Sequence, residues 1–140
     1  MARMLMLLAF LYSSHSALAQ QKVESTGITG AIKLEEVISG YLTELNGKFK
    51  LRLTEVTLAP GAHLGAHHHA GPGIRLVLSG ELTFVQAGKA IVYRTGDSFY
   101  ESGNVVHTAH NGTAAPARIA FFEVLPVQWA GPSTIPPKPY

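Results

Sequence analysis

The sequence predicts an all-β fold, a single-domain sandwich or barrel of short antiparallel strands. Fourteen glycines and eight prolines divide the 140 residues into short segments, as expected where turns are frequent. From residue 41 onward apolar and polar residues alternate with the two-residue period of a half-buried strand, and no long segment has a helical period. The length fits one domain, and no internal repeat divides it.

The composition narrows the possible functions. Hydrophobic residues make up 46% of the chain and charged residues only 14%, which indicates a globular protein with a substantial core. The net charge is +2 and the eleven lysines and arginines are scattered, so the basic patch typical of a nucleic-acid-binding protein is missing. Because the chain has no cysteine, any metal site must use histidine, carboxylate or backbone oxygen.

The N-terminus has the features of a secretory signal peptide. Arg3 precedes an apolar run at residues 4–12, and an A-x-A cleavage motif occupies residues 17–19. This run of nine residues is shorter than the roughly 20 that a membrane span needs. We therefore expect a signal peptide at residues 1–19, cut after Ala19, and a secreted or periplasmic mature chain without a membrane span.

The mature chain is predicted to begin with an N-terminal arm at residues 20–40. Within it, residues 31–38 fit either a helical turn or an edge strand. The first clear strands are residues 41–45 and 48–53, which flank Asn46-Gly47, a strong hairpin signal.

The strand after this hairpin is predicted to carry apolar residues on one face and cations on the other. Leu51 and Leu53 share one face, while Lys50 and Arg52 take the other. The apolar residues then move to even positions, which predicts a β-bulge near Thr54 or Glu55. Pro60-Gly61 is expected to end the strand.

The remaining strands follow at short intervals, and together they define a predicted barrel at residues 41–126. A tail at residues 127–140 is too rich in proline for a central strand, and we expect it to run extended over the surface. The predicted strands lie at residues 74–79, 81–86, 90–93, 98–101, 105–107 and 118–125.

Four of the seven histidines lie within residues 63–69. In a strand, side chains two residues apart share a face, so His67 and His69 point the same way, as would His63. Two imidazoles on one face can share a metal ion, and His107 is the candidate for a third ligand. The alternative is a solvated, histidine-rich loop that binds nothing.

The histidine segment and a later segment resemble the two motifs of the cupin superfamily. In the first, Gly61 is followed by five residues, by His67-x-His69 and later by Gly80; in the second, Gly96-Asp97 leads to His107 and Asn111. The resemblance covers about residues 48–125. It implies a cupin jelly-roll β-barrel, or double-stranded β-helix, that pairs as a homodimer. It also implies a divalent metal ion (Fe, Zn, Mn, Ni or Cu) bound by His67, His69 and His107.

The sequence departs from the first motif at one position that matters for chemistry. The glutamate that is usually the fourth ligand falls at Gly73, which leaves three neutral ligands and an open position. In the second motif, Ser102 and Asn104 replace a proline and a glycine, and Asn104 can still adopt a left-handed turn.

Arg75 and Glu101 are the predicted catalytic residues. Arg75 shares the face of Gly73, and we hypothesise that it pairs with a carboxylate or enolate of the substrate. Since a buried, unpaired charge is costly, this requires an anion or a nearby glutamate; the alternative is an arginine facing water. Glu101 is predicted to support a ligand imidazole or Arg75, or else to be a surface acid.

The resulting functional expectation is a dioxygenase that acts on a small, oxygen-chelating organic molecule. Two alternatives remain open. One is a non-catalytic module that binds a small ligand or a metal. The other is an isomerase or lyase in which the metal polarises a carbonyl group.

Overall fold

The computed structural model describes residues 22–138. All strand pairs between its elements are antiparallel, which confirms the all-β prediction. The predicted signal peptide lies outside the described residues. Within residues 22–138 no helix is long and apolar enough to cross a membrane. The strands are β1 (Ser25–Val37), β2 (Phe49–His69), β3 (Gly73–Ser79), β4 (Glu81–Gln86), β5 (Lys89–Arg94), β6 (Ser98–Glu101), β7 (His107–His110), β8 (Ala117–Pro126) and β9 (Thr134–Ile135).

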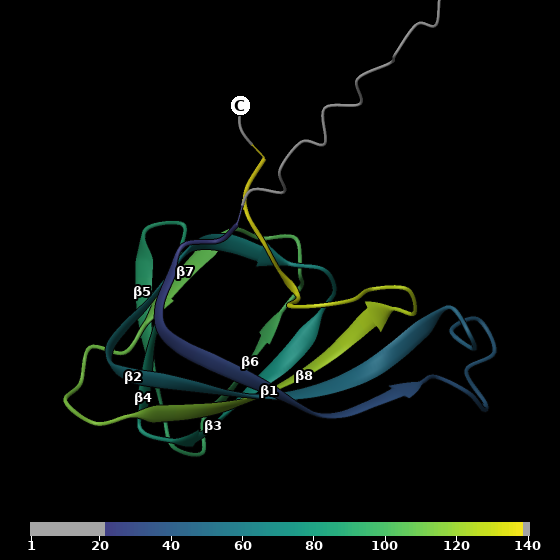
Figure 1. The fold of residues 1–140 in the computed structure, drawn as a ribbon, viewed down its shortest axis with the longest axis horizontal. Coiled ribbons are helices and arrows are strands. Elements are labelled where there is room, and N and C mark those ends of the chain that lie inside the picture. Colours follow the sequence, from purple (N-terminus) through teal and green to yellow (C-terminus); the bar gives the residue numbers. More distant parts are fainter. Residues whose placement is uncertain (1–21, 139–140) are drawn as a thin grey trace, which may run out of the picture.

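The strands follow one another in the order β5-β4-β7-β2-β8-β3-β6, with β1 and β9 added along β2. They wind around a common centre, and the segment after β8 turns back toward the histidine-bearing end of β2 (Figure 1). Inward side chains fill this centre with apolar contacts. The buried core consists of Leu58, Ala62, Val77, Leu82, Ala109, Ala117 and Ile119.

The long strand β2 joins the two sides of the barrel. Its first half pairs with β8 as far as Leu58, and its second half pairs with β7 from His63 onward. Pro60-Gly61 lies between the two ladders, where Gly61 has a φ of 71°. The prediction that Pro60-Gly61 ends the strand is therefore wrong, because these residues form the corner at which β2 changes partners.

The first hairpin differs from its prediction. Of residues 31–38, all but Ile38 belong to β1, the edge-strand alternative, whereas the strand predicted at residues 41–45 is wrong because those residues form a loop of bends and turns. The hairpin joins β1 to β2 through a longer loop, in which the Gly47 N–H donates to the Ile38 carbonyl at 3.0 Å. Asn46-Gly47 thus lies at a turn, but not at a two-residue hairpin.

Lys50 and Arg52 lie on the face opposite to Leu51, as predicted, but theirs is the buried face. Both are buried, with exposures of 6% and 4%, whereas Leu51 is 54% exposed. Glu35 of β1 accepts hydrogen bonds from Lys50 Nζ at 2.8 Å and from Arg52 Nε at 2.5 Å, and the Trp129 carbonyl accepts one from Lys50 Nζ at 2.6 Å. These partners satisfy the two cations, which removes most of the cost of burying them.

The predicted bulge lies on the neighbouring strand. β2 pairs with β8 without interruption from Phe49 to Leu58, so the even positions face inward throughout this first half of β2. The register shift falls in β1, between Ile32 and Leu34, opposite Thr54 and Leu53.

The second half of the chain follows its prediction, because β3 to β8 overlap all six predicted strands. The strand predicted at residues 105–107 is the least accurate, since β7 begins only at His107. Asn111 braces the turn after β7: its Nδ2 donates to the carbonyls of Leu58 at 3.2 Å and Ala115 at 2.7 Å. In the turn before β7, Gly103 has the positive φ of 92°, in place of the left-handed Asn104 that the sequence suggested.

Candidate metal centre

Three histidines from two strands meet inside the barrel. His67 and His69 extend from β2 and His107 from β7, and their exposures are 1%, 4% and 5%. One nitrogen from each lies within 4.8 Å of the other two. The structure therefore brings together the three predicted metal ligands.

A register shift in β2 selects which histidines face inward. It lies between Leu64 and His67, so positions 67 and 69 are buried while His63 is exposed. The shared face predicted for His63 is wrong for this reason. His63 instead pairs across the strands with His110 of β7.

The hydrogen bonds of the Nδ1 atoms leave each Nε2 free as a ligand. His67 Nδ1 lies 2.8 Å from the Gly65 carbonyl oxygen, and His107 Nδ1 lies 3.0 Å from that of Val105. A carbonyl oxygen only accepts hydrogen bonds, so Nδ1 carries the proton in each neutral ring. Each Nε2 therefore keeps the lone pair that a metal ion requires.

Burial keeps these imidazoles neutral. It lowers the pKa of His67 to about 3, with the charge of His107 as the next cause. Burial also lowers the pKa of His107, against the opposing effect of Glu101. Neutral imidazole is the form that binds a metal ion, so His67 and His107 are in the form that binds one at neutral pH.

Glu101 of β6 faces two of these histidines. Its Oε1 lies 3.3 Å from His107 Nε2 and its Oε2 lies 3.3 Å from His69 Nε2. The side chain is 8% exposed, so Glu101 is part of the buried cluster, in contact with ligand imidazoles.

Arg75 lies fully buried beside this carboxylate. Its Nη2 is 2.5 Å from Glu101 Oε2 and 3.1 Å from Glu123 Oε1, and its guanidinium lies 4.3 Å above the ring centre of Phe121. The chain itself therefore supplies the anions that a buried arginine needs. Arg75 lines neither of the two cavities at this site, and its role toward substrate stays a prediction.

The sequence interpretation missed Glu123, which orients the third histidine. Glu123 Oε1 lies 3.1 Å from His69 Nδ1 and accepts a hydrogen bond from Ser133 Oγ at 2.7 Å. Burial raises its pKa, but the His69 hydrogen bond and the Arg75 charge outweigh this and lower it. A carboxylate on the far nitrogen of a ligand histidine fixes the ring and raises its basicity. An acid in phase with the buried Ile119 and Leu125 on β8 was the available signal.

Two cavities give access to the cluster. The inner one has a volume of about 20 Å³ and touches all three histidines and Glu101, which is room for one water molecule or small ion. The outer one, of about 700 Å³, lies at the barrel mouth. Both are lined by Ile28, Val56, Leu64 and Phe121, so the two cavities lie next to each other.

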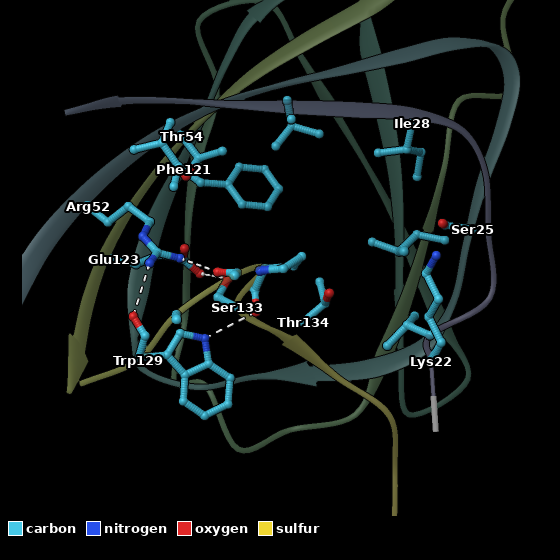
Figure 2. A pocket seen from close by; sticks show the side chains of 18 of the residues that line it. Lys22, Ser25, Ile28, Arg52, Thr54, Phe121, Glu123, Trp129, Ser133 and Thr134 are labelled. Carbon is cyan, nitrogen blue, oxygen red and sulfur yellow. Dashed lines mark hydrogen bonds between the residues drawn. The ribbon is translucent and has the colours of Figure 1, made fainter. Parts of the chain in front are cut away.

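The C-terminal segment forms one wall of the outer cavity. Arg52 Nη1 donates to the Gly131 carbonyl at 2.6 Å, and Trp129 Nε1 donates to the Pro132 carbonyl at 3.1 Å. Figure 2 shows Arg52, Glu123, Trp129 and Ser133 together on one side, opposite Ile28. The tail predicted to run over the surface thus borders the entrance to the histidines.

We expect the metal-free protein to lose stability as the pH falls below about 6.5. Unfolded histidine titrates near pH 6.5, whereas folded His67 stays neutral to about pH 3. The unfolded chain binds more protons between these values, so the free energy of unfolding decreases by roughly 1–2 kcal/mol between pH 6.5 and 5. Urea denaturation measures this change. His67→Gln should reduce it and His63→Gln should not; equal pH dependence in all three proteins would contradict the assignment.

Comparisons with known proteins agree with this architecture. A family model described as Cupin_2, Cupin domain, matches residues 54–124. A comparison with curated proteins finds no match. Among solved structures, a cupin-like protein from Thermotoga maritima is 24% identical, with a TM-score of 0.55 and coverage of 77% of this chain and 80% of that one.

Two further similar structures are those of named proteins. The polyketide cyclase RemF from Streptomyces resistomycificus is 17% identical, with a TM-score of 0.55 and coverage of 80% of this chain and 83% of RemF. KdgF from Halomonas sp. is 19% identical, with a TM-score of 0.54 and coverage of 74% and 86%. At these identities the likeness is one of fold.

Proposed function

The chain belongs to the Cupin_2 family of cupin domains, and from this premise we propose that it binds one divalent metal ion through His67, His69 and His107. The observation that carries the proposal is the meeting of three buried imidazoles whose Nδ1 atoms are occupied or oriented by other groups. A bound ion would supply Lewis-acid or oxygen-activating chemistry. The protein contributes the fixed ligand rings and an apolar inner cavity.

The substrate we propose is a small organic molecule that chelates metal through oxygen, and the reaction is that of a dioxygenase. A mouth of about 700 Å³ falls in the size range of small-molecule sites. Phe121 lies where the two cavities meet, so a planar apolar substrate could pack on it with its oxygens toward the histidines.

Elemental analysis of protein purified without added metal tests the metal site. We expect close to one metal ion per chain in the wild type. His107→Ala should lose most of this metal, because only two of the three imidazole ligands remain. His110→Ala is the matched control, since His110 lies on the same strand and is only half-buried. Absence of metal from the wild type, or equal content in both variants, would contradict the proposal.

Oxygen uptake tests the reaction type. With ferrous iron and a diketone or catechol, uptake that depends on His107 would support a dioxygenase. Conversion of substrate without uptake would favour an isomerase or lyase, and binding without conversion would favour a non-catalytic module.

We also propose that the protein acts after export. The support is the basic start, the apolar run and the A-x-A motif at residues 17–19. N-terminal sequencing of the exported protein should begin at Gln20; a cytoplasmic protein that begins at Met1 would contradict this.

An apolar stripe on the outside of the barrel supports the proposal of a homodimer. It consists of residues paired directly across β1, β2, β8, β3 and β6, which therefore share a face. Ile74, Tyr100 and Phe122 in it are 54%, 67% and 47% exposed. The stripe is Leu34, Leu53, Phe122, Ile74 and Tyr100.

The dimer can be tested by light scattering after size exclusion. Phe122→Lys places a charge in the middle of the stripe, and we expect it to convert a dimer into a monomer. Ile91→Lys is the control, because Ile91 is similarly exposed, at 48%, but lies on β5 outside the stripe. A wild type that is monomeric at high concentration would overturn the proposal.

A further inference from the structure

The carboxylate that the first motif lacks is present one strand away. Gly73 of β3 occupies the position of the family glutamate, and it pairs directly with Glu101 of β6. Directly paired residues in an antiparallel ladder lie about 4.5–5.5 Å apart and point to the same face. Glu101 therefore enters the barrel beside the place where a glutamate at position 73 would enter.

The contacts of Glu101 with the histidines are those of ligands around a cation. Each of its two oxygens lies 3.3 Å from the Nε2 of a different histidine. The Nδ1 atoms of these rings contact the Val105 carbonyl and the Glu123 carboxylate, so the Nε2 atoms are the ones turned toward Glu101. Two ligand atoms about 2.1 Å from one ion lie roughly 3.0–3.4 Å apart.

Arg75 holds the carboxylate in this orientation, and Gly73 makes room for Arg75. Arg75 Nη2 contacts Oε2 at 2.5 Å, which leaves Oε1 directed at His107. A Cβ at position 73 would overlap Arg75 Nη1 and the Phe122 carbonyl oxygen. A glutamate at position 73 and this placement of Arg75 thus exclude each other. The position of Arg75 therefore accounts both for the absence of a glutamate at position 73 and for the orientation of Glu101.

We propose that Glu101 is the fourth protein ligand of the metal, supplied by β6 in place of β3. This inference rests on the proposed three-histidine site and deepens it. The donor set becomes three imidazoles and one carboxylate, and Arg75 is a positioning residue that acts through Glu101. Mn²⁺ prefers carboxylate oxygen to imidazole nitrogen as a ligand. Glu101 should therefore contribute more to the affinity for Mn²⁺ than to the affinity for Zn²⁺.

Competitive chelator titrations of Mn²⁺ and Zn²⁺ test the inference in the full protein. Glu101→Gln keeps the shape of the side chain and leaves Arg75 paired with Glu123. The matched control is Glu123→Gln, which also removes a carboxylate from Arg75 but contacts only the far nitrogen of His69. Loss of such an outer contact costs about 10–100-fold in metal affinity. We expect Glu101→Gln to weaken Mn²⁺ by more than about 100-fold, and Zn²⁺ by a smaller factor.

The visible spectrum of the Co²⁺-loaded proteins gives a second readout. We expect Glu101→Gln to change the band positions and intensities, and Glu123→Gln to retain them. If Glu101→Gln weakens metal no more than Glu123→Gln and leaves the spectrum unchanged, the inference is wrong while the three-histidine site stands. If the wild type binds no metal, the proposed function fails as well. Should Glu101→Gln not fold, a crystal structure of the Co²⁺-loaded wild type decides: Oε1 within about 2.2 Å of the ion supports the inference, and a separation beyond about 3 Å overturns it.

Discussion

Arg75→Leu should destabilise the fold by about 3–5 kcal/mol, the usual cost of removing one partner of a buried ion pair. The guanidinium is fully buried between Glu101 and Glu123, whose side chains are 8% and 1% exposed. Leucine would leave two carboxylates close together without a cation, and would also remove the contact above Phe121. Urea denaturation of the metal-free protein measures the loss directly.

Arg118→Leu is the control for this prediction. Arg118 also pairs with a glutamate across the sheet, at 2.8 Å from Glu55, but its side chain is 50% exposed. Exposed pairs contribute about 0–1 kcal/mol, so this variant should stay near the wild type. Similar losses in the two variants would contradict the role assigned to the buried cluster. Unchanged metal content and substrate affinity in Arg75→Leu would contradict the predicted contact of Arg75 with substrate.

The features that could be predicted are those encoded by residues near one another in the chain. Alternation and turn residues place β3 to β8, and the spacing of His67 and His69 puts both imidazoles on one face. Arg75 is inward for the same reason, since it shares the parity of Gly73 along an unbroken strand. The resemblance to the second cupin motif then adds His107 as the third predicted ligand.

The features that could not be predicted depend on partners far away in the sequence. Lys50 and Arg52 face inward because Glu35 and carbonyls of the C-terminal segment satisfy them. The apolar stripe also places apolar residues on the outer face of β2, so the sequence pattern of that face resembles the pattern of a buried one. In the same way, the roles of Glu101 and Glu123 depend on strand pairing between distant parts of the chain. Glu101 lies on β6 and Glu123 on β8, the two strands beside β3, and both residues pair with Gly73.

Gly73→Ala should destabilise the protein by about 1–3 kcal/mol or more, the range for inserting atoms into a closely packed site. The added Cβ would overlap the Phe122 carbonyl oxygen, which belongs to the backbone of β8, as well as Arg75 Nη1. Gly30→Ala is the matched control in β1, because a Cβ there meets only Thr54 Cγ2, at 3.6 Å. We expect Gly30→Ala to remain within about 1 kcal/mol of the wild type.

A double-mutant cycle shows whether Gly73 and Arg75 depend on each other. In the Arg75→Leu background the overlap with Nη1 disappears while that with the backbone of β8 remains. Gly73→Ala should then cost less than in the wild type, with a coupling of about 0.5–3 kcal/mol, as is usual for residues in contact. Additive effects would mean that Gly73 serves only the close approach of β3 to β8. Coupled effects would mean that this glycine is what allows an arginine, and through it Glu101, to replace the missing glutamate.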